Sequence, residues 1–165
     1  MKKEIRRNMW RAAATVLVVA WMILIFSFSA QPDTESSQIS GRVSYRLVET
    51  ANRLFHKGMT EKQMEAAALK IDYPVRKTAH MTEYGILAVL ILHMLWAYGW
   101  RGKLFLSSLF MTGAYACTDE FHQLFIPGRA GRFTDVLIDS AGACIALAFA
   151  ELIIHIYKKI KNRKR

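Results

Sequence analysis

The sequence predicts an all-α integral membrane protein, a four-helix bundle with a short amphipathic helical segment outside the membrane. Of its 165 residues, 53% are apolar and only 22% are charged, which is an oily composition for a soluble domain of this length. Four stretches with few or no charges reach or approach the roughly 20 apolar residues that cross a bilayer as a helix. Composition and the spacing of these stretches therefore place the chain in a membrane.

The first predicted span covers residues 12–30 and follows a basic start, residues 1–11. A cleaved signal peptide is the alternative interpretation, since a basic start, an apolar core and small residues near its end are typical of one. The apolar core is long for a signal peptide. We therefore favour a transmembrane helix that is retained.

The polar segment between the first two spans, residues 31–75, opens with a disorder-like stretch and then shows helical spacing up to residue 54. Thr60 begins a capping-box pattern for a second short helix. Asp72 and Pro74 suit the start of the next span, as its N-cap and an early helical proline. We expect an amphipathic pair of helices on the outer leaflet or over the bundle, and the alternative is a lid over a site.

The core, residues 76–157, contains the remaining three predicted spans. They lie at about residues 81–100, 104–121 and 136–157. The middle one reaches spanning length only if its last turn, with Asp119, also enters the bilayer or its interface.

Lys and Arg residues predict the orientation of the chain. Five precede the first span, two lie in the break at residues 100–103, and six follow the last span in the tail, residues 158–165. With four spans these three segments share one side, and cytoplasmic loops are enriched in Lys and Arg. We therefore expect a multi-pass membrane protein with both termini in the cytoplasm. The net charge of +10 does not indicate a nucleic-acid binder, which needs its basic residues in one patch.

The two cysteines, Cys117 and Cys144, lie within apolar stretches and match no zinc motif. Two cysteines are too few for a disulfide framework. We expect packed, free thiols.

Ionisable side chains gather at the outer ends of three predicted spans, although such groups are costly inside a membrane. Helical periodicity places them on shared faces: Arg76, His80 and Glu83; then Asp119, His122 and Gln123; then Arg132, Asp135 and Asp139. Arg and Lys can hold phosphate oxygens, a His can act as nucleophile or transfer a proton, and a carboxylate can orient it. This pattern points to a phosphorylated lipid head group. Asp and His could instead hold a divalent metal, or the charges could form salt bridges that only fix the bundle.

Three motifs resemble those of the VanZ-like family of small bacterial membrane proteins. They are RKTAHMTEYG at 76–85, TDEFHQLFIPGR at 118–129 and FTDVLIDSAG at 133–142, and the end of the first span, FSAQ, is similar too. The resemblance implies four to five membrane spans. It also implies an association with low-level resistance to the glycopeptide teicoplanin, and a relationship to enzymes that act on lipid head groups has been proposed for the family.

On these motifs the resemblance implies a site of eleven residues. We assign the chemical step to His80, Glu83, Asp119, His122 and Asp135, and ligand binding to Lys77, Glu120, Gln123, Arg129, Arg132 and Asp139. No cofactor or metal ligand is assigned. The expected partners are membrane lipids, with a lipid-linked cell-wall precursor or a glycopeptide as the candidate ligand. A non-enzymatic binder at the outer leaflet and a structural membrane partner are the alternatives. Transport is disfavoured because the polar groups lie at one end of the bundle.

Overall fold

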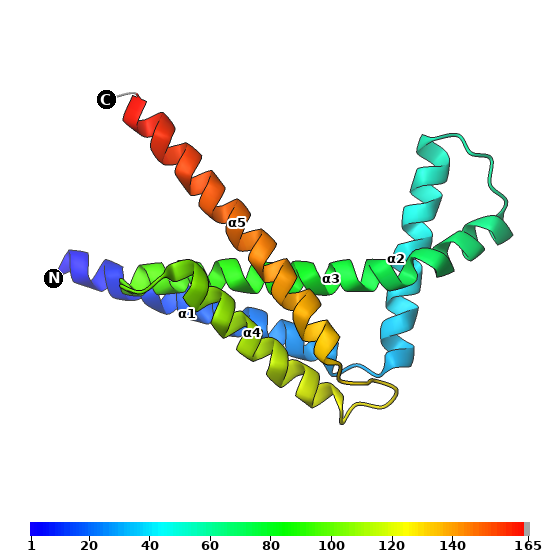
Figure 1. Ribbon diagram of the computed structural model, residues 1–165, viewed down its shortest axis with the longest axis horizontal. Coiled ribbons are helices and arrows are strands. Elements are labelled where there is room, and N and C mark those ends of the chain that lie inside the picture. Colours follow the sequence, from blue (N-terminus) through cyan, green and yellow to red (C-terminus); the bar gives the residue numbers. More distant parts are fainter. Residues whose placement is uncertain (164–165) are drawn as a thin grey trace.

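The computed structural model describes residues 1–163, and this part of the chain consists of helices without a strand. The helices are α1 (Lys2–Ser29), α2 (Asp33–Leu54), α3 (Glu61–Tyr98), α4 (Leu104–Gln123) and α5 (Phe133–Arg163). The predicted all-α class is confirmed. Figure 1 shows α1, α3, α4 and α5 extending from one end of an elongated molecule, while α2 lies crosswise at the other end.

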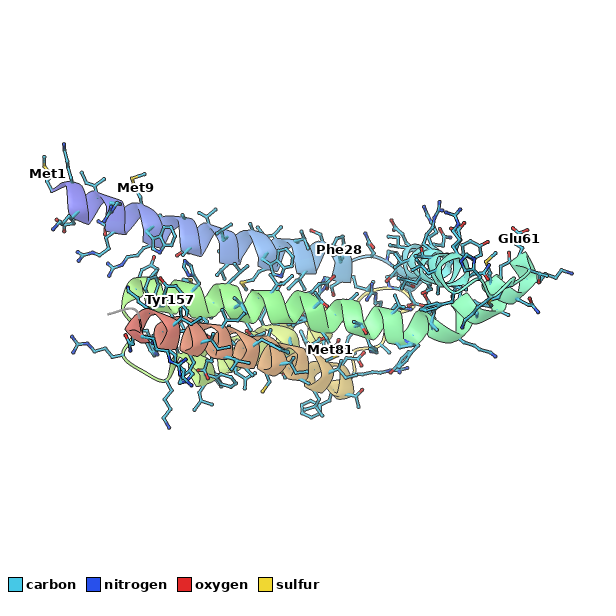
Figure 2. The ribbon with its side chains drawn as sticks, turned by 90° about the horizontal axis from the view of Figure 1, so that it is seen from above. Met1, Met9, Phe28, Glu61, Met81 and Tyr157 are labelled. Atoms are coloured by element: carbon cyan, nitrogen blue, oxygen red, sulfur yellow. The ribbon has the colours of Figure 1, made fainter. Side chains whose placement is uncertain are left out.

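Helix α3 is the centre of the fold, because α1, α2, α4 and α5 all pack against it. Figure 2 shows α1 on one side of α3 and α5 on the other. The main apolar core lies along α3, where Tyr84 and Leu87 are fully buried, and Ile25 of α1 and Ala116 of α4 pack onto them. A second cluster joins α3 to α5 through Ala88 and Leu147.

The contact of α3 with α5 depends on small residues. A Cβ atom added to Gly142 would lie 2.3 Å from the carbonyl oxygen of Met81, and one added to Gly85 would lie 3.1 Å from the Cβ of Ala146. The two backbones therefore approach more closely than a larger side chain permits, as is common between membrane helices.

Three helices among the described residues, α1, α3 and α5, are long and apolar enough to cross a membrane. Helix α4, the third predicted span, is outside this class because Asp119 and Glu120 in its last turn reduce its mean hydropathy. It nevertheless packs along both α3 and α5. The four-span arrangement therefore stays a prediction, whereas membrane-spanning helices are established.

The expectation of packed thiols was wrong in one respect. Cys117 and Cys144 are free, but both are exposed at the molecular surface. Many large apolar side chains of the same helices, such as Phe110, Phe149 and Ile153, are exposed as well. An apolar surface of this kind faces lipid rather than a protein core, so an apolar residue in a span need not be buried by the protein.

The segment before the second span also differs from its prediction. The capping box at Thr60 is confirmed, but α3 continues from Glu61 through Pro74 to Tyr98 as one helix. Asp72 lies inside α3 and is therefore not an N-cap. Its Oδ1 accepts a hydrogen bond of 3.1 Å from Ser44 Oγ of α2. No residue in the left-handed conformation interrupts α3 before Gly99, so the proline removes one backbone hydrogen bond without ending the helix.

The two ends of the molecule differ in charge. The start of α1, the end of α5 and the α3–α4 turn lie at one end, and the α1–α2 link and the α4–α5 loop lie at the other (Figure 1). At the first end Arg11 Nε donates to the carbonyl of Ala97 at 3.1 Å. At the second end the backbone N–H of Asp33 donates to the carbonyl of Pro127 at 3.3 Å. The basic segments therefore gather at the end remote from the predicted site.

Candidate functional site

Two adjoining hollows occupy the end that carries α2. The polar hollow has a volume of about 260 Å³ and is lined by Asp33, Tyr73, Arg76, Lys77, His80, Gln123, Gly128, Arg129, Ala130, Arg132 and Asp135. The amphipathic hollow has a volume of about 200 Å³ and is lined by Ile25, Phe28, Ser29, Gln31, Ser36, Ile39, Ser40, Val43, Val75, Arg76, Ala79, His80, Glu83, Asp119 and Arg129. Arg76, His80 and Arg129 line both hollows, so the two adjoin at these residues.

The polar hollow carries more positive than negative charge. Its lining has four cationic side chains (Arg76, Lys77, Arg129 and Arg132) and two acidic ones (Asp33 and Asp135), with His80 taken as neutral. Both carboxylates are engaged in ion pairs. Lys77 Nζ lies 2.6 Å from Asp135 Oδ1, and Arg76 Nη2 lies 2.8 Å from Asp33 Oδ1. Two guanidinium groups therefore remain for an anion.

The first of these, Arg129, also fastens the end of α1. Its Nε donates to the carbonyl of Gln31 at 3.0 Å and its Nη2 donates to that of Phe28 at 3.2 Å. Burial and the neighbouring Arg76 lower the pKa of the Arg129 guanidinium, while Asp33 acts in the opposite direction. The charge is thus less well stabilised than in water, so an incoming anion would stabilise it.

The second, Arg132, is held by its backbone. Its N–H donates to Oε2 of the buried Glu120 at 2.8 Å, which fixes the loop before α5. Its side chain is exposed and has no ion-pair partner among residues 1–163. A guanidinium presents a fork of donors that fits two oxygens of a phosphate.

His80 lies where the two hollows meet. Its Nδ1 is 4.0 Å from Oδ1 of Asp139, a distance that permits an ion pair when the imidazole is protonated but is too long for a hydrogen bond. Asp139 is 1% exposed, and neither of its carboxylate oxygens has a hydrogen-bond partner in the described part of the chain. The imidazole is therefore backed by a buried carboxylate from α5.

Asp119 joins α3 to α4 below the hollows. Its Oδ2 accepts hydrogen bonds from the hydroxyl of Tyr84 at 3.0 Å and from Nε2 of Gln123 at 3.2 Å. The same amide nitrogen lies 3.4 Å from Oε1 of Glu120. Asp119 is 3% exposed, and its Oδ1 has no partner within residues 1–163 although the residue lines the amphipathic hollow. One carboxylate oxygen is thus structural and the other is left for an occupant.

The structure brings most of the predicted site together. Eight of the eleven residues line one or both hollows: Lys77, His80, Glu83, Asp119, Gln123, Arg129, Arg132 and Asp135. Glu120 and Asp139 lie behind them as supporting carboxylates. His122 lines neither hollow; its ring stacks on that of Phe26 at a centroid distance of 4.3 Å. Of the two candidate histidines, His80 lines both hollows and His122 lines neither.

Sequence reasoning missed the contribution of α2. The stretch expected to be disordered begins α2 at Asp33, which pairs with Arg76, and Ser37 Oγ accepts from the same arginine at 3.1 Å. Proline followed by acidic residues is a signal for a helix start that could have revealed this. The buried Ser29 is a further lining residue; it lies in the FSAQ stretch but was not among the predicted site residues.

A divalent metal was one interpretation of the Asp and His residues. Within residues 1–163, no group of three or more His, Cys, Asp or Glu side chains has a geometry that could hold a metal ion. The arrangement instead offers guanidinium donors, one imidazole and buried carboxylates. This combination suits the binding of an anionic group and the transfer of a proton.

A family model described as VanZ/LLP1 matches residues 14–154. This range includes all eleven predicted site residues and both hollows. Neither a curated protein nor a solved structure matches the chain.

Proposed function

This chain belongs to the VanZ/LLP1 family of membrane proteins, and from that premise we propose that its polar hollow binds the phosphate group of a membrane lipid or of a lipid-linked cell-wall precursor. One observation carries the proposal. Arg129 and Arg132 line a hollow at the end of membrane-spanning helices, and neither is in an ion pair with a carboxylate of the described chain. A hydrogen bond between charged groups contributes about 1.5–3 kcal/mol, so two guanidinium groups supply substantial affinity for a phosphate.

The proposal includes the orientation of the protein. We place the end with both termini in the cytoplasm, because Lys and Arg near spans favour that side. The two hollows then open toward the outer leaflet of a bacterial plasma membrane. This is the leaflet in which a completed lipid-linked cell-wall precursor is used.

We assign the chemical step to His80. On one route the imidazole attacks phosphorus, the P–O bond to the head group breaks, the released oxygen takes a proton from water, and water then hydrolyses the phosphohistidine. On the other route the imidazole accepts the proton of a hydroxyl that attacks phosphorus and gives it to the head-group oxygen as the P–O bond to the head group breaks. Asp139 would stabilise the positive charge that either route places on the ring. Arg129 and Arg132 would hold the non-bridging oxygens, while Glu83 and Asp119 would contact the ligand on the other side of His80. We include resistance to teicoplanin in the same proposal, since a chemical change in a cell-wall precursor alters the molecule that a cell-wall antibiotic binds.

The experiment uses the purified protein in lipid nanodiscs with radiolabelled lipid-linked precursors and phospholipids. We expect release or exchange of a head group by the wild type and its loss in His80→Ala. His122→Ala is the matched control and keeps the activity, because its ring lies against Phe26 outside both hollows. Turnover that is equal in wild type and His80→Ala would remove the catalytic assignment.

The distance between His80 and Asp139 favours a second candidate function, in which the protein binds the lipid and forms no product. The 4.0 Å between His80 and Asp139 leaves the imidazole without a short hydrogen bond to an orienting carboxylate. On this alternative the protein sequesters the lipid. Its affinity then depends on Arg132 while no covalent change appears in any labelled lipid.

A further inference from the structure

We propose that the amphipathic hollow holds an apolar chain of the ligand, so that one lipid spans both hollows with its phosphate beside His80. This inference rests on the proposed function and adds the class of ligand. The site then takes a chain-bearing phosphate that arrives from the membrane rather than a phosphate dissolved in water.

The two hollows adjoin and differ in character. The polar hollow is lined mainly by charged side chains, whereas the amphipathic hollow has apolar side chains from both helices that border it, with Ile25 of α1 at its buried side and Ile39 and Val43 of α2 at its exposed side. The residues shared by the two hollows, including His80 and Arg129, are polar. A ligand that occupies both hollows must therefore be polar at one end and apolar at the other.

The apolar part of the hollow opens toward lipid. Figure 1 shows α2 crossing α3 close to where α1 ends, an orientation expected for a helix at a membrane surface. Figure 2 shows α2 end-on, close to the end of α1 that carries Phe28. Three apolar side chains of the hollow are substantially exposed: Phe28 at 47%, Ile39 at 45% and Val43 at 47%. They form the edge between α1 and α2, where an alkyl chain can enter without crossing water.

Two buried polar atoms indicate that the occupant is not an alkyl chain alone. Ser29 Oγ and Asp119 Oδ1 belong to residues that line the hollow, and neither atom has a hydrogen-bond partner in the described residues. Ser29 is 2% exposed and Asp119 is 3% exposed, so water does not readily satisfy either of them. A hydroxyl or phosphate hydroxyl at the polar end of the chain would supply the missing partner.

The test compares two probes that share a phosphate monoester, hexadecyl phosphate and methyl phosphate, with the protein in phosphatidylcholine nanodiscs. Ile39→Trp and Val43→Trp fill the hollow, and Leu47→Trp is the matched control because Leu47 is an exposed α2 residue that does not line the hollow. We expect the two filled variants to bind hexadecyl phosphate about tenfold more weakly than wild type, a change of about 1.4 kcal/mol. Leu47→Trp should remain within about twofold, and methyl phosphate should bind all four proteins equally.

A second measurement does not depend on the stability of the variants. Hexadecyl phosphate with a photoreactive group in its chain, added to the wild type, should crosslink to the α1 and α2 segments that contain Ile25 and Val43. Crosslinks confined to α4 or α5, or unchanged hexadecyl phosphate affinity in both filled variants, would overturn the inference. The proposed function remains supported after that result if Arg132→Gln still weakens the binding of both probes. It fails if neither phosphate binds the wild type.

Discussion

Asp139 lies behind His80, with its Oδ1 4.0 Å from Nδ1 of the imidazole and with 1% of the residue exposed. Both carboxylate oxygens lack hydrogen-bond partners in the part of the chain that the structure describes. A buried polar group without partners normally destabilises a fold. The position of Asp139 makes physical sense if the imidazole gains a proton, because the two groups then form a buried ion pair.

Asp139→Asn tests this pair. The variant should fold with an unchanged or higher Tm, because the substitution removes a buried charge that has no partner. On the proposed function its kcat for head-group release should fall by about 10²-fold, since general acid–base catalysis contributes about 10²–10⁴-fold, while KM stays the same. The measurement is a kinetic series in nanodiscs beside thermal unfolding in detergent. A lower Tm with normal kcat would show that Asp139 serves the fold alone.

Arg132 and Arg129 should respond differently to substitution. Arg132→Gln should weaken phosphate binding by about tenfold or more without a change of Tm, because its guanidinium contacts no other residue through an ion pair in residues 1–163. Arg129→Gln should weaken binding and also lower Tm, because Arg129 donates to the carbonyls of Phe28 and Gln31. Equal phosphate affinity in wild type and Arg132→Gln would contradict the placement of phosphate in the polar hollow.

Tyr84→Phe should destabilise the protein. The hydroxyl of Tyr84 donates to Asp119 at 3.0 Å within a buried network, and its removal should lower the free energy of unfolding by about 1–3 kcal/mol. Tyr98→Phe is the matched control, since its hydroxyl contacts Thr15 at an exposed position, and should change stability by less than about 0.5 kcal/mol. Unfolding of both variants in detergent, followed by circular dichroism, provides the comparison.

Asp119→Asn separates a functional site from a purely structural role of the charges. Loss of a charged acceptor for Tyr84 and Gln123 should lower Tm in either case. If Asp119 also contacts a ligand, hexadecyl phosphate should raise the Tm of the wild type more than that of the variant. The absence of any such ligand shift in the wild type would favour a structural membrane partner.

Gly142→Ala should disrupt the contact of α3 with α5. The added Cβ would lie 2.3 Å from the backbone oxygen of Met81, so the helices must separate, at a cost of at least about 1–3 kcal/mol. Gly113→Ala is a good control because its nearest neighbour would be Ser140 Oγ at 3.5 Å. That variant should be neutral or stabilised by up to about 1 kcal/mol, as alanine favours a helix over glycine. Thermal unfolding of both variants, compared with the wild type, tests this prediction.

Several features of this protein follow from the sequence itself. Apolar length predicts the membrane helices, and the structure has helices that are long and apolar enough to span a membrane. The distribution of Lys and Arg predicts that both termini lie in the cytoplasm, and this orientation stays a prediction. Thr60 with Gln63 predicts the start of α3, because a capping box is a local interaction that needs no tertiary contact. Three short motifs predict most of the polar side chains that line the hollows, because helical periodicity puts each group on one face.

Other features needed the tertiary structure. Periodicity placed His122 on the same face as Asp119, yet the packing of α1 against α4 puts its ring on Phe26. The sequence predicted a disordered stretch followed by a surface helix where α2 lies. In the structure, Asp33 and Ser37 of α2 bind Arg76, and α2 closes one side of the hollows. The sequence alone determined most of the helical segments and which helix faces are polar, since both depend mainly on neighbours within a few residues. Only the packing of α1, α2, α4 and α5 around α3 decided which polar faces meet, because that depends on contacts between residues far apart in the chain.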